Sequence, residues 1–119
     1  MSDIKAKFES KSQELSNLQT ELNDLFLARS QLETQFQENK IVLQEFDHLS
    51  SDSKIYKLTG PILLPQEYDE AKLNVNKRIE FIGEEIKRVE AKIADTEKSL
   101  TGARDQLIEI RGQIAAGSQ

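Results

Sequence analysis

Few residues in this chain have side chains suited to catalysis. His48 is the single histidine and follows Asp47, Glu84 and Glu85 form an adjacent acidic pair, and cysteine is absent. A histidine beside a carboxylate suits a metal ligand or a base, and paired carboxylates suit general acid and base catalysis. We interpret His48 instead as a cation at a helix end, and Glu84 as an exposed group paired with Arg88 four residues later. We therefore expect no active site, no metal, no cofactor and no enzymatic activity.

Charge and composition exclude further classes. The chain has 16 basic and 21 acidic residues, a net charge of −5, which disfavours binding to nucleic-acid phosphates and anionic membranes. The basic pairs Lys77–Arg78 and Lys87–Arg88 are interleaved with glutamates, so they form no basic stripe. No apolar run approaches the length of a membrane span, and the first residues lack a signal-peptide core. We expect a cytoplasmic protein with neither nucleic acid nor membrane as a partner.

Proline and glycine divide the chain into two long segments. Both prolines, Pro61 and Pro65, lie in one central stretch beside Gly60, just after the turn-forming cluster Ser50–Ser51–Asp52–Ser53. This pattern predicts a first helix over residues 1–49, a loop and β-hairpin over 50–65, and a second helix over 66–116. All of residues 1–119 form a single domain in this interpretation.

Each long segment carries seam positions at alternating spacings of four and three residues. In the first segment they are Ile4, Phe8, Lys11, Leu15, Leu18, Leu22, Leu25, Arg29, Leu32, Phe36, Asn39, Leu43 and Phe46. In the second they are Val75, Ile79, Ile82, Ile86, Val89, Ile93, Thr96, Leu100, Ala103, Leu107, Ile110 and Ile114. Nearly all are apolar, and such spacing over more than five heptads is typical of a coiled coil.

The two helices are predicted to pack antiparallel. When residues whose numbers add up to 118 are paired, every seam position from Ile4 to Leu43 meets another seam position. Totals of 111 and 125 satisfy the heptads as well, but 118 puts the midpoint beside the Gly60–Pro61 break. The fold class expected is mainly α: a long antiparallel two-helix coiled coil with one central β-hairpin.

The central stretch is more than a connector. Lys54–Leu58 and Ile62–Leu64 flank Thr59–Gly60–Pro61, which indicates a β-hairpin. An isolated hairpin is marginal in water and its open edges pair with other strands, whereas a simple connector needs only a few polar residues. Pro65 cannot donate a strand hydrogen bond, which limits the second strand. We expect the hairpin to assemble with a partner sheet through Ile55, Tyr56, Leu58, Gly60, Pro61, Ile62, Leu63 and Leu64.

Several apolar residues lie off the seam. They are Phe26, Leu27, Val42, Leu49, Leu73, Phe81 and Ile108. Single exposed apolar residues are common on protein surfaces, but those near the break are also placed to pack against the hairpin or a neighbouring subunit.

The free ends of the helices form an apolar tip in this pairing. It gathers Ile4, Phe8, Leu107, Ile108, Ile110 and Ile114. Lys11 in the seam and the nearby Gly102, Gly112 and Gly117 weaken the last turns, so we expect the tip to be loosely closed.

One central motif resembles a known family. The run Tyr56–Leu64, followed by Glu70–Ile82 and placed between two coiled-coil helices, resembles the β class of prefoldin subunits over essentially the whole chain. The resemblance implies a heterohexamer of two α-class and four β-class subunits, with hairpins joined in β-barrels and coiled coils as tentacles. It further implies an ATP-independent chaperone that holds unfolded actin and tubulin chains at its tips and passes them to the cytosolic chaperonin.

Two other functions stay open at this point. A coiled-coil scaffold or tether without client binding would form a self-sufficient homodimer and tolerate charge at its tips. An enzyme arm, such as one that grips tRNA, would need a catalytic domain and a basic arm surface, and the sequence shows neither.

Overall fold

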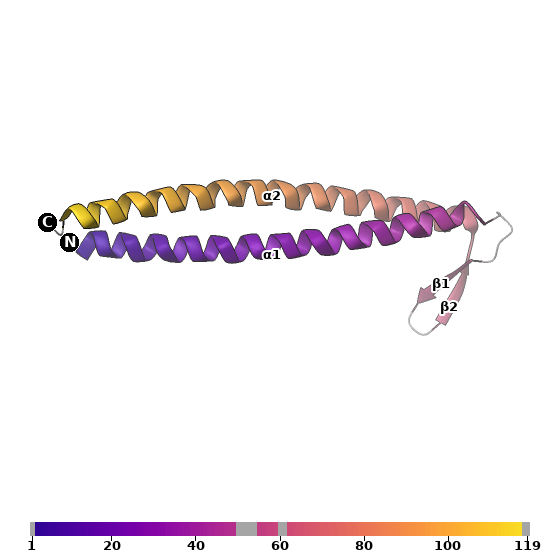
Figure 1. The fold of residues 1–119 in the computed structure, drawn as a ribbon. Coiled ribbons are helices and arrows are strands. Elements are labelled where there is room, and N and C mark those ends of the chain that lie inside the picture. The colour runs from indigo at the N-terminus through magenta and orange to yellow at the C-terminus, as the bar shows by residue number, and fades with distance from the viewer. Residues whose placement is uncertain (1, 50–54, 60–61, 118–119) are drawn as a thin grey trace. The chain divides into compact units, whose positions relative to one another are not determined.

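The computed structural model describes residues 2–49, 55–59 and 62–117. Its elements follow in the order α1 (Ser2–Phe46), β1 (Ile55–Thr59), β2 (Ile62–Gln66) and α2 (Tyr68–Gly117), as Figure 1 shows. The protein is thus mainly α, with two long helices. Within these ranges, no helix combines the length and apolar character that a membrane span requires.

The helix ends differ slightly from the expected positions. α1 ends at Phe46 rather than at residue 49, because the amides of Asp47, His48 and Leu49 donate to carbonyls three residues earlier in a tightened turn. α2 begins at Tyr68 rather than at residue 66, because β2 continues to Gln66. Asp69 and Glu70 lie in its first turn, where the helix dipole favours acidic groups.

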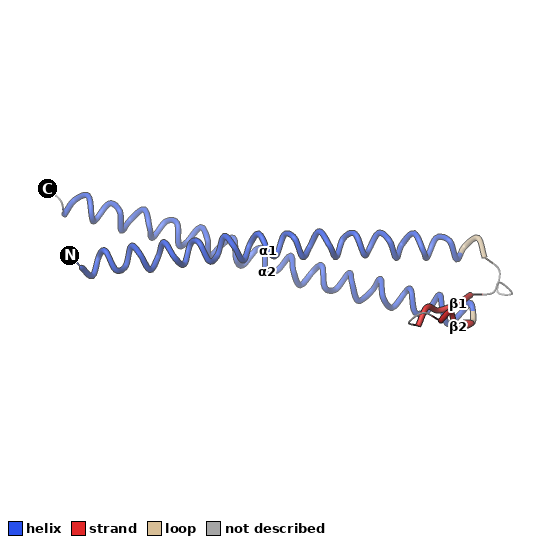
Figure 2. Tube along the Cα trace, turned by 90° about the horizontal axis from the view of Figure 1, so that it is seen from below, coloured by secondary structure: helices blue, strands red, loops and turns tan. Residues whose placement is uncertain are grey.

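The two strands pair antiparallel. Their register joins Ile55 to Gln66, Lys57 to Leu64 and Thr59 to Ile62, and Figure 2 shows them side by side in red. β2 runs through Pro65, which lies opposite Tyr56, and an edge strand tolerates a missing donor. In the part of the chain that the structure describes, the sheet contains only these two strands, so each has one open edge.

The chain forms two compact units, and both helices contribute to each. Unit 1 comprises Met1–Arg29 and Arg88–Gln119, and unit 2 comprises Ser30–Lys87. The core of unit 1 is a cluster of Leu22, Ile93 and Leu100, against which Leu15, Leu18, Leu25 and Val89 pack. The core of unit 2 is a cluster of Phe46, Ala71 and Val75, against which Leu43, Tyr68 and Ile79 pack.

The seam prediction is confirmed residue by residue. Every predicted seam position in both helices is buried or partly buried, including the polar ones. Thr96 is 6% exposed, and no buried side-chain polar atom among the described residues lacks a hydrogen-bond partner. Arg29 keeps its charge paired, because its Nη2 lies 3.3 Å from Oε1 of Glu90 on the other helix.

Contacts between the helices fix the register inside each unit. In unit 1, Arg29 contacts Glu90, and the Arg111 guanidinium lies over the Phe8 ring at 6.0 Å. In unit 2, a Cβ on Gly83 would lie 3.7 Å from the Phe36 ring. The residue numbers of each pair add up to within one of the predicted 118, which excludes the alternatives of 111 and 125.

Candidate functional site

In unit 1 the free ends of α1 and α2 lie side by side (Figure 1). We call these ends, residues 2–11 and 104–117, the tip. Of the six predicted tip residues, Ile4, Phe8, Leu107, Ile110 and Ile114 are partly buried in the seam. Ile108 lies off the seam and is 61% exposed. The structure therefore brings the predicted set together, with one member on the outer surface.

The seam closes less completely at the tip than farther along the helices. Leu100 is 8% exposed and Ala103 only 3%, whereas no later seam position of α2 reaches that degree of burial. At Gly102 and Gly112 an added Cβ would meet no atom within 4 Å, so packing does not require glycine there. These glycines cost the helix about 1 kcal/mol each relative to alanine. The tip thus keeps apolar surface available on weakened helical turns.

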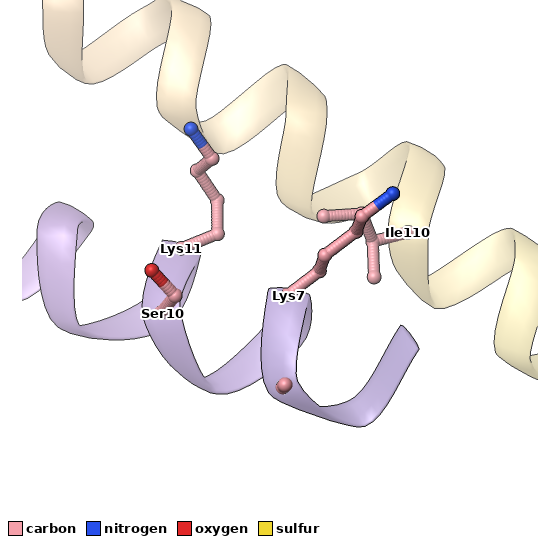
Figure 3. Close-up of a pocket in the computed structure, with 5 residues that line it drawn as sticks. Lys7, Ser10, Lys11 and Ile110 are labelled. Carbon is pink, nitrogen blue, oxygen red and sulfur yellow. The ribbon is translucent and has the colours of Figure 1, made fainter. Parts of the chain in front are cut away.

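A shallow depression of about 360 Å³ lies on the surface of the tip. It is lined by Ala6, Lys7, Ser10, Lys11 and Ile110, four of which Figure 3 labels. Lys11 Nζ lies 2.8 Å from Oε2 of Glu14, so that cation is paired along the helix. The sequence interpretation missed this depression, although the small residues Ala6 and Ser10, four apart on α1, are the signal that indicates it.

The predicted assembly hairpin is described through its backbone. Ile55, Tyr56 and Leu58 belong to β1, and Ile62, Leu63 and Leu64 belong to β2. Gly60 and Pro61 lie outside the described residues. The free strand edges have backbone donors and acceptors suited to adding further strands.

In unit 2 an aromatic contact joins the end of α1 to the start of α2. The Phe46 and Tyr68 rings meet edge to face, with centroids 5.5 Å apart and an interplanar angle of 66°. The Tyr68 hydroxyl donates a 2.7 Å hydrogen bond to the Phe46 carbonyl, which also accepts the Leu49 amide of the tightened turn. The heptad pattern did not reveal this contact, because Tyr68 precedes the predicted seam of the second helix.

The residues considered for catalysis form no centre. His48 is exposed and lies beyond the end of α1, and Glu84 is exposed on α2. No group of three or more potential metal ligands occurs in the described ranges.

The off-seam apolar residues are exposed in the single chain, and packing of those near the break against the hairpin or a neighbouring subunit stays a prediction. Their exposed fractions run from 40% for Val42 to 62% for Phe81, and Ile41, which the sequence interpretation did not single out, is 55% exposed.

The sequence pattern of the prefoldin subunit family matches residues 9–113. The chain therefore belongs to the prefoldin family of chaperone subunits. It is 47% identical over 116 residues to prefoldin subunit 6 of Saccharomyces cerevisiae, covering 98% of this chain and 96% of that protein. It is 34% identical over 111 residues to prefoldin subunit 6 of Homo sapiens, covering 93% of this chain and 86% of that protein.

A solved structure shares the fold. The prefoldin beta subunit from Thermococcus strain KS-1 superposes with a TM-score of 0.56 at 20% identity, covering 92% of this chain and 90% of that one. The resemblance to prefoldin subunits that the central motif indicates is confirmed by the family match, and the relatives named above are of the subunit 6 type.

Proposed function

We propose that this chain is one subunit of a cytosolic, heterohexameric prefoldin complex that acts without ATP. In this proposal its hairpin joins hairpins of α- and β-class subunits in a β-barrel. Its tip holds unfolded chains, with actin and tubulin as clients, and the complex delivers them to the cytosolic chaperonin. The protein is a binding subunit and catalyses no reaction.

Membership of the prefoldin subunit family is the observation that carries this proposal. Two structural features support it. The first is a sheet of two strands whose outer edges are open among the described residues, which is suited to assembly with other hairpins.

The second feature is the tip. Its seam residues are only partly buried and Ile108 is 61% exposed, so apolar area is available without unfolding the rest of the helix pair. Full burial of one such side chain contributes about 1.5–3 kcal/mol, and half-buried groups contribute part of that. Several tips acting together supply enough for weak, reversible holding without nucleotide.

The test is a polar tip in an assembled complex. The triple variant Phe8→Ser/Ile110→Ser/Ile114→Ser is combined with α-class and other β-class subunits, and the mass of the complex is measured by native mass spectrometry. We expect a hexamer of unchanged stoichiometry that suppresses the aggregation of guanidine-denatured actin less well. Because other subunits also have tips, matching changes in the partners should enlarge the loss.

The matched control is Ala91→Ser, at an exposed position of α2 in unit 1 that lies outside the tip. It should leave both assembly and holding unchanged. Undiminished holding by a hexamer with every tip made polar would contradict the proposed client site. A stable homodimer that ignores the other subunits would instead favour a scaffold or tether.

A further inference from the structure

Within unit 1 the two helices have different outer surfaces. Between Ser12 and Leu27, one side of α1 has exposed residues without any charge, in a protein in which 31% of residues are charged. We call this the uncharged face: Ser16, Gln19, Thr20, Asn23, Phe26 and Leu27. α2 in the same unit has exposed charges on its outer side, at Asp95, Lys98 and Asp105, and also beside the seam, at Lys92, Glu97 and Arg104.

Polar side chains of the uncharged face already form hydrogen bonds within α1. Gln19 Nε2 donates to Asn23 Oδ1 at 3.1 Å, and Thr20 Oγ1 donates to the Ser16 carbonyl at 3.1 Å. A chain that binds this face of α1 displaces water from no charged group of the face, so the cost of desolvation stays low. Side-chain amides also offer both donors and acceptors, so they match the unpaired backbone of an extended chain.

At its end farther from the tip, the uncharged face has two apolar residues. Phe26 is 48% exposed and Leu27 is 59% exposed. Phe26 flanks the seam of the helix pair. The ion pair of Glu90 with Arg29 lies on the same side of the seam as Phe26, and so does the contact of Arg111 with Phe8 at the tip.

Ile108 lies three residues before Arg111 on α2, so the two residues share a face of that helix. Ile108 therefore provides an apolar group on the same side of the seam, at the tip. By the register of the pair, Ile108 lies level with residue 10 of α1, about 25 Å from Leu27 at the helical rise. An extended chain spans that length with about seven or eight residues.

We propose that the uncharged face of α1 binds an extended segment of an unfolded client whose neighbouring segment is held at the tip. Ile108 and the pair Phe26–Leu27 contact apolar side chains of that segment, and the amides between them contact its backbone. This inference rests on the proposed function and extends it from the tip along the side of the helix pair.

The area favours an unfolded segment over a folded subunit as the occupant. A stable interface between folded subunits buries roughly 1,000 Å² or more around a contiguous apolar core. Two adjacent apolar residues, separated from Ile108 by amides and hydroxyls, provide no such core. Weak contacts spaced along a line suit a chain that must later be released.

Photocrosslinking of the assembled hexamer tests the location. Asn23 is replaced by benzoylphenylalanine in one sample and Asp24, on the other side of the same helix, in the control. Labelled, guanidine-denatured actin is then added and the complex is irradiated. We expect client adducts from position 23 at least 5-fold above those from position 24.

A probe at Phe8 separates this inference from the proposed function. Client adducts from position 8 with none from position 23 would overturn the inference and leave the tip site standing. Adducts from position 23 to another prefoldin subunit would overturn it as well, by showing a subunit interface. Absence of client adducts from both positions would contradict the proposed function itself.

A variant supplies the functional measurement. Phe26→Gln/Leu27→Gln, carried in the hexamer, should raise the complex concentration that halves actin aggregation by about 3- to 10-fold, as expected for losing one to two partly buried apolar contacts. Ala91→Gln, at an exposed position of α2 in the same unit, is the control and should leave that concentration unchanged. An unchanged value for the double variant, with assembly intact, would overturn the role of these two residues.

Discussion

The apolar cores of the two units are built from different contacts. In unit 1 the cluster around Leu22, Ile93 and Leu100 consists of aliphatic side chains that interdigitate along the seam. In unit 2 the cluster around Phe46 depends on an aromatic contact with Tyr68 and a hydrogen bond to the last turn of α1. A heptad repeat is enough where two helices continue side by side. Where α1 ends, the carbonyls of its last turn need other donors, and at Phe46 these are the Leu49 amide and the Tyr68 hydroxyl.

The hairpin end should respond most strongly to mutation. We expect Ile62→Asp/Leu64→Asp to abolish incorporation into the complex, because burying an unpaired carboxylate between strands costs several kcal/mol. The helices pack through a separate seam, so helix content should stay largely intact. Co-purification with the partner subunits and circular dichroism measure the two effects. If the variant still co-purifies normally, the hairpin is not the assembly element.

Truncating one side chain in each cluster compares the two cores directly. Phe46→Ala should destabilise unit 2 by about 3 kcal/mol or more, and Leu22→Ala should destabilise unit 1 by about 2–3 kcal/mol. Hydrogen exchange of the assembled complex, resolved by peptide, measures each effect where it occurs. Phe46→Ala should speed exchange around residues 40–46 and 68–79, and Leu22→Ala around 18–25 and 89–100. Equal acceleration everywhere in both variants would show a single cooperative core.

The hydroxyl of Tyr68 should contribute less than its ring. Tyr68→Phe keeps the edge-to-face contact and removes the 2.7 Å hydrogen bond to the Phe46 carbonyl, so we expect a loss of about 1 kcal/mol. The readout is exchange of the amides in the last turn of α1. A Tyr68→Phe variant with the exchange pattern of Phe46→Ala would place most of the energy in the hydrogen bond instead.

The smallest effect is expected at the tip. Gly112→Ala adds a methyl group in open space and should stabilise the end of α2 by about 0.5–1 kcal/mol. Amides over residues 107–117 should then exchange a few times more slowly. Faster exchange there would mean that the tip packs more tightly than the exposed fractions indicate.

The sequence predicted the parts of the fold that follow from periodicity. The seam positions and the off-seam placement of residues such as Phe26 and Phe81 follow from spacings of three and four along a helix. The glycine and proline break placed the turn region. The seam of each helix depends on local sequence alone, whereas the antiparallel register required pairing the two segments about the Gly60–Pro61 break.

The contacts that the sequence did not predict depend on where the elements end. The Phe46–Tyr68 contact requires the exact last residue of α1 and first residue of α2, and the heptads give neither. The strand through Pro65 was harder to predict because proline is unfavourable in most strands but tolerated at an edge. The roles of the tip and hairpin residues came from the family resemblance and stay predictions.

The seam positions keep alternating spacings of four and three residues, and they pair at a constant total of residue numbers. Both features restrict how the length of this protein can change in evolution. Removing one residue from α1 rotates every later side chain by about 100° and takes the remaining seam out of line. Removing seven from one helix alone preserves the seam but leaves a stretch of the other helix without a partner. An arm therefore shortens or lengthens only in paired heptads, one on each side of the hairpin, in steps of about 10 Å. Insertions and deletions among relatives should accordingly come as matched sevens, or fall at the free ends and in the central turn.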